Sequence, residues 1–424
     1  MKAYTKFVAI FAISLAALAP SLFAQLNIPS DGSDGALVIS NNTVIDLSQA
    51  VTAAWDANNS ANAGKGIYDS NKWAVVFKYS SVIISNNATL TFANHPSRAP
   101  VVWLVNGNVT IGGTLSLTGQ NYIPAPGLAE PGPGGFRGGS GRFTSGVGKG
   151  AGFGPGGGSF QSSDSRWGAG GSYGSVGADG PLTYGNPSTL PLIGGSGGGG
   201  GGYREPDVSG GGGGGAILIA CSGTLSAAGT IRASGGNGSD GGNPDYYSGG
   251  GSGGALRLVA ATLSGTGVIQ TLAGGGARPG GLGRIRIERV SNNSSLQVTP
   301  DPSVVTLQAN DTPLIWLPSD GPTARIVSIG AVGAPADPRA AFGTFGADVT
   351  LPQVSTTPVV VETTNAEAAS IVKIRVSPRA NGNYTETTAT LTQTNSTNPL
   401  VLRWTANVPV NNGYSAVQVK VVRP

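Results

Sequence analysis

Short segments in which apolar residues occupy every second position recur along this chain, and one of them occurs in three similar copies. The copies lie at 215–220, 254–259 and 283–288. After the first two copies the same downstream motifs follow in the same order, and only the glycine-rich connections differ in length. Constant strand motifs joined by connections of variable length predict a stacked β-solenoid rather than a closed globular fold.

The alternation within each copy predicts which side chains face the core. Because successive side chains of a strand point to opposite faces, Ile217 and Ile219 should point inward, as should their counterparts in the other copies. The intervening column contains Leu218, Arg257 and Arg286, which should face outward because an unpaired arginine is too costly in a narrow apolar core. Three short strands per turn suit a three-sided, right-handed β-helix. In the first copy the predicted strands are 215–221, 223–227 and 229–233.

Residues 25–125 show the same alternation in further short segments. Turn pairs such as Asn106-Gly107 separate these segments and supply the positive φ angle needed at corners. Trp103 falls in the outward column if its two neighbours face the core. We therefore predict one solenoid domain over residues 25–299.

Residues 127–215 form a glycine-rich insertion in this domain, with aromatic residues at intervals. A disordered linker is one interpretation of this composition. The other is a set of ordered loops against the solenoid, because disordered segments are poor in large aromatic residues. Polyglycine strands with three residues per turn could then pack side by side. In composition the insertion resembles the glycine-rich extracellular domain of the anaplastic lymphoma kinase family, which implies packed strands of this kind.

Beyond residue 300 glycine becomes rarer, and the pattern predicts a separate β-sandwich over residues 300–424. Seven short alternating strands are expected in an immunoglobulin or fibronectin type III-like fold. Asn381-Gly382 and Asn412-Gly413 each lie between two of these strands, where they predict tight hairpins. The predicted strands are 324–330, 347–351, 359–363, 371–377, 385–392, 400–407 and 415–422.

Residues 1–24 have the features of a secretory signal peptide. Lys2 and Lys6 precede an apolar run, and small residues precede Gln25, so we expect cleavage after Ala24. The apolar run is too short to span a bilayer as a mature helix. The expected location is therefore extracellular or on the cell surface, without a transmembrane segment once the signal is removed.

Composition narrows the possible functions further. The chain has 25 basic and 21 acidic residues, and loss of the two signal lysines leaves 23 against 21. This small excess is not the footprint of a nucleic-acid-binding protein. Cys221 is the only cysteine, so an intramolecular disulfide is excluded and a buried thiol is expected. His95 is the only histidine, which excludes multi-histidine metal sites, and we expect no metal and no cofactor.

Candidate catalytic residues are few. Many β-helices degrade polysaccharides, and Glu205 and Asp207 would share one face of an extended segment. Hydrolysis needs two carboxylates about 5–10 Å apart across a sugar, and the alternative is that this spacing arises by chance among the many acids in loops. His95 lies in a polar loop between two apolar strands, where it is either a ligand contact or general base, or part of a corner that prolines fix. Asp31 and Asp34 lack the regular acidic spacing of a calcium loop and predict a turn.

Candidate ligand-binding residues are Arg257, Arg286, Arg284 and Trp103. Arginines on neighbouring turns would lie about 4.8 Å apart and repel one another unless an anion or an acid lies between them. They are either a basic row for the uronate or phosphate groups of a polymer, or solvated residues that discourage edge aggregation.

The segments 73–79, 94–103 and 131–137 resemble those of uncharacterised glycine-rich secreted proteins of bacteria. The solenoid itself is similar to the β-helices of haemagglutinin-type adhesins and pectate lyase-like proteins. These resemblances imply a β-helical fold and carry no catalytic motif onto this chain. The sequence thus favours an exported, non-enzymatic structural or adhesive protein, whose partner would be a surface or matrix polysaccharide. The alternatives are a polysaccharide lyase or hydrolase, and a carbohydrate-binding protein without catalysis.

Overall fold

A computed structural model describes residues 25–142, 148–160, 167–202, 207–240, 247–339 and 346–424. The described chain is all-β, as predicted, and its helical content is two 3₁₀ turns, η1 (Leu47–Gln49) and η2 (Ser60–Asn62). The predicted signal peptide at 1–24 lies outside the described residues.

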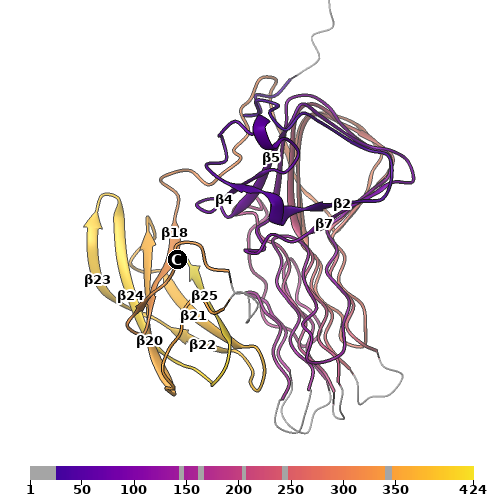
Figure 1. Ribbon diagram of the computed structural model, residues 1–424. Coiled ribbons are helices and arrows are strands. Elements are labelled where there is room, and N and C mark those ends of the chain that lie inside the picture. The colour runs from indigo at the N-terminus through magenta and orange to yellow at the C-terminus, as the bar shows by residue number, and fades with distance from the viewer. Residues whose placement is uncertain (1–24, 143–147, 161–166, 203–206, 241–246, 340–345) are drawn as a thin grey trace, which may run out of the picture.

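Two sheets made almost entirely of parallel strands occupy the first part of the chain (Figure 1). The eleven-stranded sheet contains β1 (Ala36–Ile39), β6 (Ser81–Ile84), β9 (Val109–Ile111), β11 (Ala216–Ala227), β8 (Val101–Val105), β5 (Ala74–Tyr79), β4 (Ile67–Asp69) and β3 (Val51–Thr52), with β13 (Ala255–Gly265), β15 (Arg284–Ser294) and β17 (Ser303–Thr306) continuing from β11. The six-stranded sheet contains β16 (Gln297–Thr299), β14 (Val268–Gln270), β12 (Thr230–Arg232), β10 (Thr114–Ser116), β7 (Thr89–Ala93) and β2 (Thr43–Asp46). Along the chain, one or more strands of the eleven-stranded sheet alternate with single strands of the six-stranded sheet. Among the described residues, the pair of β4 and β5 is the one antiparallel pair in these two sheets.

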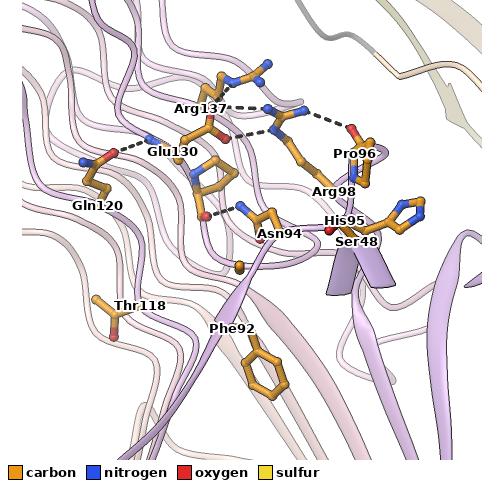
Figure 2. Close-up of a pocket in the computed structure, with 12 residues that line it drawn as sticks. Ser48, Phe92, Asn94, His95, Pro96, Arg98, Thr118, Gln120, Glu130 and Arg137 are labelled. Atoms are coloured by element: carbon orange, nitrogen blue, oxygen red, sulfur yellow. Dashed lines mark hydrogen bonds and ion pairs between the residues drawn. The ribbon is translucent and has the colours of Figure 1, made fainter. Parts of the chain in front are cut away.

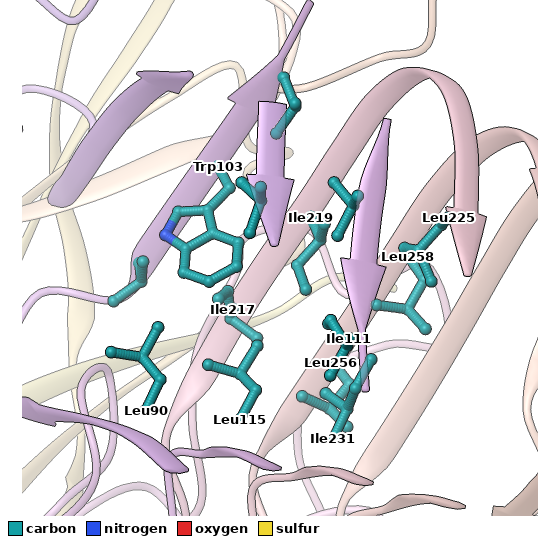
Figure 3. Packing of buried hydrophobic residues seen from close by; sticks show 14 of the residues in the cluster. Leu90, Trp103, Ile111, Leu115, Ile217, Ile219, Leu225, Ile231, Leu256 and Leu258 are labelled. Atoms are coloured by element: carbon teal, nitrogen blue, oxygen red, sulfur yellow. The ribbon is translucent and has the colours of Figure 1, made fainter. Parts of the chain in front are cut away.

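The three similar copies pair with one another in the predicted register. Ile217 lies opposite Leu256, and Leu256 lies opposite Ile285. All three side chains are at most 3% exposed and belong to the main apolar cluster. Figure 3 shows Ile217 and Leu256 within this cluster. The predicted inward column is therefore confirmed.

Trp103 points inward, so the predicted outward orientation is wrong. It lies opposite Ile219 in the parallel pairing, and its side chain is 0% exposed in the main cluster (Figure 3). Its neighbours Val102 and Leu104 pack on the other side of the sheet. The run Val101–Val105 contains no polar residue to mark its outer face, so either alternation fits the sequence equally well.

The outer face of the eleven-stranded sheet is covered. Leu218 faces away from the main cluster, as predicted, but it is only 2% exposed. It belongs to a second apolar cluster that includes Leu26 and Ile315, from segments on either side of the parallel sheets in the sequence. Residues that the alternation places outside the core are thus buried by chain segments that precede and follow the sheets in the sequence.

The described glycine-rich segments are joined by backbone hydrogen bonds with a period of three residues. The amides from Gly210 to Gly215 donate in turn to three neighbouring segments, and the order then repeats. The acceptors are the carbonyl oxygens of Gly139, Gly249, Gln120, Phe136, Ser252 and Leu117, at 2.8–2.9 Å. Three residues per turn is the period of the polyproline II helix. These segments are ordered strands, as in the second interpretation of the sequence, and Figure 1 shows them running side by side.

The absence of side chains is a steric requirement in this part of the protein. A Cβ atom on Gly198 would lie 2.0 Å from the carbonyl oxygen of Gly249, whereas a Cβ on Gly333 would meet nothing within 4 Å. We expect Gly198→Ala to lower the free energy of unfolding by about 1–3 kcal/mol, the usual range for overpacking. Gly333→Ala is the matched control and should change it by less than about 0.5 kcal/mol. Urea denaturation measures both, and equal effects would contradict close packing at Gly198.

The C-terminal part contains two antiparallel sheets. The five-stranded sheet contains β19 (Val332–Gly333), β18 (Thr323–Ile329), β20 (Thr356–Thr364), β24 (Leu400–Pro409) and β23 (Thr390–Thr397). The three-stranded sheet contains β22 (Thr385–Thr388), β21 (Ile371–Pro378) and β25 (Ser415–Val422). Val361, Trp404 and Ile374 come from both sheets and share one buried apolar cluster.

The two predicted hairpins have different outcomes. Asn381-Gly382 joins β21 and β22, which pair as predicted. Asn412-Gly413 joins β24 to β25, which lie in different sheets, so that hairpin prediction is wrong. A local turn preference favours a reversal of the chain but does not determine which strand the next one pairs with. The predicted strand at 347–351 is absent from the described residues, and β17 continues the parallel pairing past the predicted boundary at residue 299.

Candidate functional site

The arginines proposed as a basic row are held by internal partners. Arg257 is 2% exposed, and its Nε donates to Oε1 of Glu288 at 2.9 Å. Arg286 donates to the same oxygen at 3.1 Å. Arg284 donates to the carbonyl oxygen of Tyr184 at 2.8 Å. Glu288 therefore relieves the repulsion between Arg257 and Arg286, and it lies two positions after Arg286 on β15. The guanidinium groups of these arginines are engaged within the protein and do not form a row of free cations for a polymer.

Removal of Arg257 should destabilise the fold. Burial lowers the pKa of Arg257 while the Glu288 charge opposes that shift, so the pair is a buried ion pair with a desolvation penalty. We expect Arg257→Met to lower the free energy of unfolding by about 3 kcal/mol, because Glu288 would keep its charge with one partner fewer. Arg325→Met is the control, since Arg325 is 72% exposed and pairs with Glu362 at the surface; it should cost below about 1 kcal/mol. Thermal or urea unfolding measures both variants, and an equal decrease in the free energy of unfolding would contradict this prediction.

His95 is a buried part of a corner. Its Nδ1 lies 2.8 Å from the hydroxyl oxygen of Ser97, and its ring stacks on Tyr68 with centroids 4.0 Å apart. Burial, followed by the positive charge of Arg339, lowers the pKa of His95 to about 4. The Tyr68 hydroxyl in turn donates to Asp337 at 2.5 Å. A neutral ring in this stack acts as a packing and hydrogen-bonding group.

The lowered pKa of His95 predicts a pH-dependent stability. The unfolded chain binds a proton at His95 near its ordinary pKa of 6.5, and the folded chain does so only near 4. Because the unfolded state binds more protons between these values, folding should lose stability as the pH falls from about 6.5 to 4. His95→Phe keeps a ring against Tyr68 but cannot be protonated, so it should show a smaller loss over this range. Urea denaturation at a series of pH values measures this, and identical profiles would contradict a lowered pKa.

The predicted acid pair is only partly described. Glu205 lies outside the described residues, so its pairing with Asp207 stays a prediction. Asp207 is 0% exposed, and its carbonyl oxygen accepts from the amide of Ala125 at 2.7 Å. Burial lowers the pKa of Lys149, and the negative charge of Asp207 opposes that shift. Asp207 is therefore a buried charge close to a cation.

The turn at Asp31 and Asp34 contains a built-in cation. The Lys78 ammonium group lies 3.2 Å from Asp31 Oδ2 and donates to the carbonyl oxygens of Asp56 and Ala57. Burial raises the pKa of Asp31, but hydrogen bonds from Ser33 and Lys78 outweigh it and hold the pKa at about 2. The turn prediction is consistent with this arrangement, because a lysine occupies the oxygen-lined position.

A cavity of about 630 Å³ lies at the carboxyl ends of β7 and β10. Its polar and aromatic lining includes Phe92, Asn94, Thr118, Gln120, Glu130 and Arg137. Figure 2 shows Glu130 between the guanidinium groups of Arg98 and Arg137. The same view shows the imidazole of His95 directed away from Gln120 and Thr118.

Glu130 joins two arginines from different segments. Arg98 Nε donates to its Oε2 at 3.0 Å, and Arg137 Nε donates to its Oε1 at 2.6 Å. The acid is the most exposed of the three, with 42% exposure of its side chain against 18% and 9% for the arginines. Burial raises the pKa of Glu130, although the charge of Arg98 opposes this. The cavity therefore presents a carboxylate that two cations hold in place.

The sequence contains little to indicate this site. Arg98 and Glu130 are 32 positions apart, and no spacing rule links them. Arg98 has a φ angle of +55°, which directs the chain at the end of the 94–100 loop. The surroundings of both residues are recognisable as loops, but the contact depends on how the glycine-rich segments pack.

No family model, curated protein or solved structure matches this chain. Among the described residues, no group of three or more His, Cys, Asp or Glu side chains is placed to hold a metal ion. In the same parts of the chain, no helix is both long and apolar enough to cross a membrane. Cys221 is buried, and burial raises the pKa of its thiol to about 12, so it is an unreactive core residue as predicted.

Proposed function

We propose that this protein is an exported, non-enzymatic component of the cell surface or extracellular matrix with a structural or adhesive role. In this proposal the parallel strands form a right-handed β-helix that carries the glycine-rich strands. The two C-terminal sheets form an immunoglobulin or fibronectin type III-like sandwich. Parallel pairing of successive chain segments supports the first assignment, and one apolar cluster shared by two antiparallel sheets supports the second.

The observation that carries the proposal is that two candidate chemical groups, His95 and Glu130, are engaged in fixed contacts. His95 is buried with a lowered pKa, and Glu130 is held by two arginines. A general acid or base needs a pKa near the working pH and access to substrate. His95 meets neither condition, and Glu130, which lines the cavity with a raised pKa, is held in place by Arg98 and Arg137.

A carbohydrate-binding protein without catalysis is the second candidate. The cavity at Glu130 favours it, because amide, hydroxyl, carboxylate and aromatic side chains converge there. The polysaccharide-active enzyme depends on Glu205 and Asp207, and nothing among the described residues adds to the case for it.

The first experiment separates these functions. The protein from residue 25 onward is incubated with neutral and acidic polysaccharides, and new reducing ends and unsaturated products are measured. We expect no product, together with depletion of the protein onto at least one polymer or onto cell-wall material. Product that disappears in Glu205→Gln, but persists in the control Asp240→Asn at an exposed acid, would overturn the non-enzymatic proposal.

A further inference from the structure

We propose that the cavity at Glu130 binds a neutral, hydroxyl-rich saccharide. This inference rests on the adhesive form of the proposed function and identifies the ligand class of one site. A volume of about 630 Å³ lies within the range of small-molecule sites, roughly 300–1,000 Å³. The cavity therefore has room for one or more sugar rings.

The Glu130 carboxylate supplies a fixed hydrogen-bond acceptor. Its two oxygens accept from Arg98 and Arg137 at 2.6–3.2 Å, and these bonds keep the group in one orientation. A carboxylate has about four acceptor positions, and the arginines use three of them, so one position at Oε2 can still accept from a ligand hydroxyl group. Charge-assisted hydrogen bonds of this kind are about twice as strong as neutral ones.

The charge arrangement favours a neutral ligand over an acidic one. Of the three charged groups, the carboxylate is the most exposed, and the arginines behind it are 18% and 9% exposed. The most exposed group is thus the anion, which repels the carboxylate of a uronate at short range, although the cluster of two arginines and one glutamate carries a net charge of +1. Like charges at short range in a partly buried site repel strongly.

Asn94 lines the cavity with a side chain that is held in place. Its amide nitrogen donates to the carbonyl oxygen of Pro131 at 2.8 Å, which fixes the side chain. Its Oδ1 is buried, and the described residues offer it no hydrogen-bond donor. Asn94 therefore contributes a fixed wall to the cavity.

Phe92 supplies the apolar surface that a sugar ring requires. Its ring packs against Trp103, with centroids 6.3 Å apart and planes at 57°, so its position is set by the core. It is only partly buried and lines the cavity. Gln120 and Thr118 are exposed beside it and add amide and hydroxyl partners. The aromatic ring can pack against the C–H groups of a sugar, and the amide and hydroxyl groups can bind its O–H groups.

The test blocks the cavity without removing a buried side chain. Thr118→Phe places a phenyl group at the exposed cavity wall just after β10, and the control is Thr230→Phe in β12, which pairs with β10 and does not line the cavity. Depletion isotherms are measured on cellulose, chitin and mannan, and on a de-esterified pectin gel as the acidic polymer. We expect the wild type to bind a neutral polymer, Thr118→Phe to bind it at least about tenfold more weakly, and Thr230→Phe to bind it unchanged.

A second variant addresses the acceptor directly. Glu130→Gln keeps the shape of the side chain and removes its charge. We expect this variant to bind about tenfold more weakly and to remain folded, as measured by circular dichroism. If Glu130→Gln is unfolded, the comparison of Thr118→Phe with Thr230→Phe alone tests the inference. Binding to pectin only, equal binding by the two threonine variants, or no binding to any neutral polymer would overturn the inference.

These outcomes are distinguishable from failure of the proposed function. Adhesion to cell-wall material that Thr118→Phe leaves intact would reject the saccharide site and retain the adhesive role. Release of product from any polymer would reject the non-enzymatic role itself.

Discussion

Close contact between backbones is the constraint on which the glycine-rich part of this protein depends. A Cβ atom on Gly200 would lie 1.8 Å from the carbonyl oxygen of Ser140, and one on Gly249 would lie 1.8 Å from that of Ala169. Only glycine permits this approach, and the approach lets each amide reach a carbonyl of a neighbouring segment. Composition and fold are therefore linked here by sterics, and side-chain packing is secondary.

The same packing places the acid of the candidate site. Two hydrogen bonds to Gln120 hold Glu130 in place. The backbone amide of Gln120 donates to the Glu130 carbonyl oxygen, and the backbone amide of Glu130 donates to the side-chain Oε1 of Gln120. Arg137 follows within the same glycine-rich segment, whereas Arg98 comes from the loop after β7. The ion cluster thus joins the glycine-rich strands to the parallel sheets, and its geometry depends on both.

How much of the fold and of the candidate site could be predicted depends on how far apart in the sequence the interacting residues lie. The register of the three copies follows from alternation, and Ile217 opposite Leu256 was predictable for that reason. Trp103 was not, because an uninterrupted apolar run does not mark its inner face. Arg257 was expected outside the main core and lies outside it, but its burial depends on Glu288 and on the carbonyl of Leu314 far along the chain. The cavity at Glu130 is likewise lined by residues that are far apart in the sequence, so neither spacing nor composition indicated it.

Buried cations show a common arrangement that bears on function. Lys78 binds Asp31 and two carbonyl oxygens, and Arg375 donates to the carbonyl oxygens of Pro155 and Gly157 at 2.9 Å. Each ties a strand to a distant segment, and Arg375 ties the C-terminal sheets to the glycine-rich strands. Arg98 and Arg137 follow this arrangement at Glu130, whose side chain is 42% exposed against 39% for Asp31, and Glu130 in addition lines the cavity. An ion cluster that is structural on one side and open on the other can position a ligand without supplying a proton, which is the behaviour of a binding site.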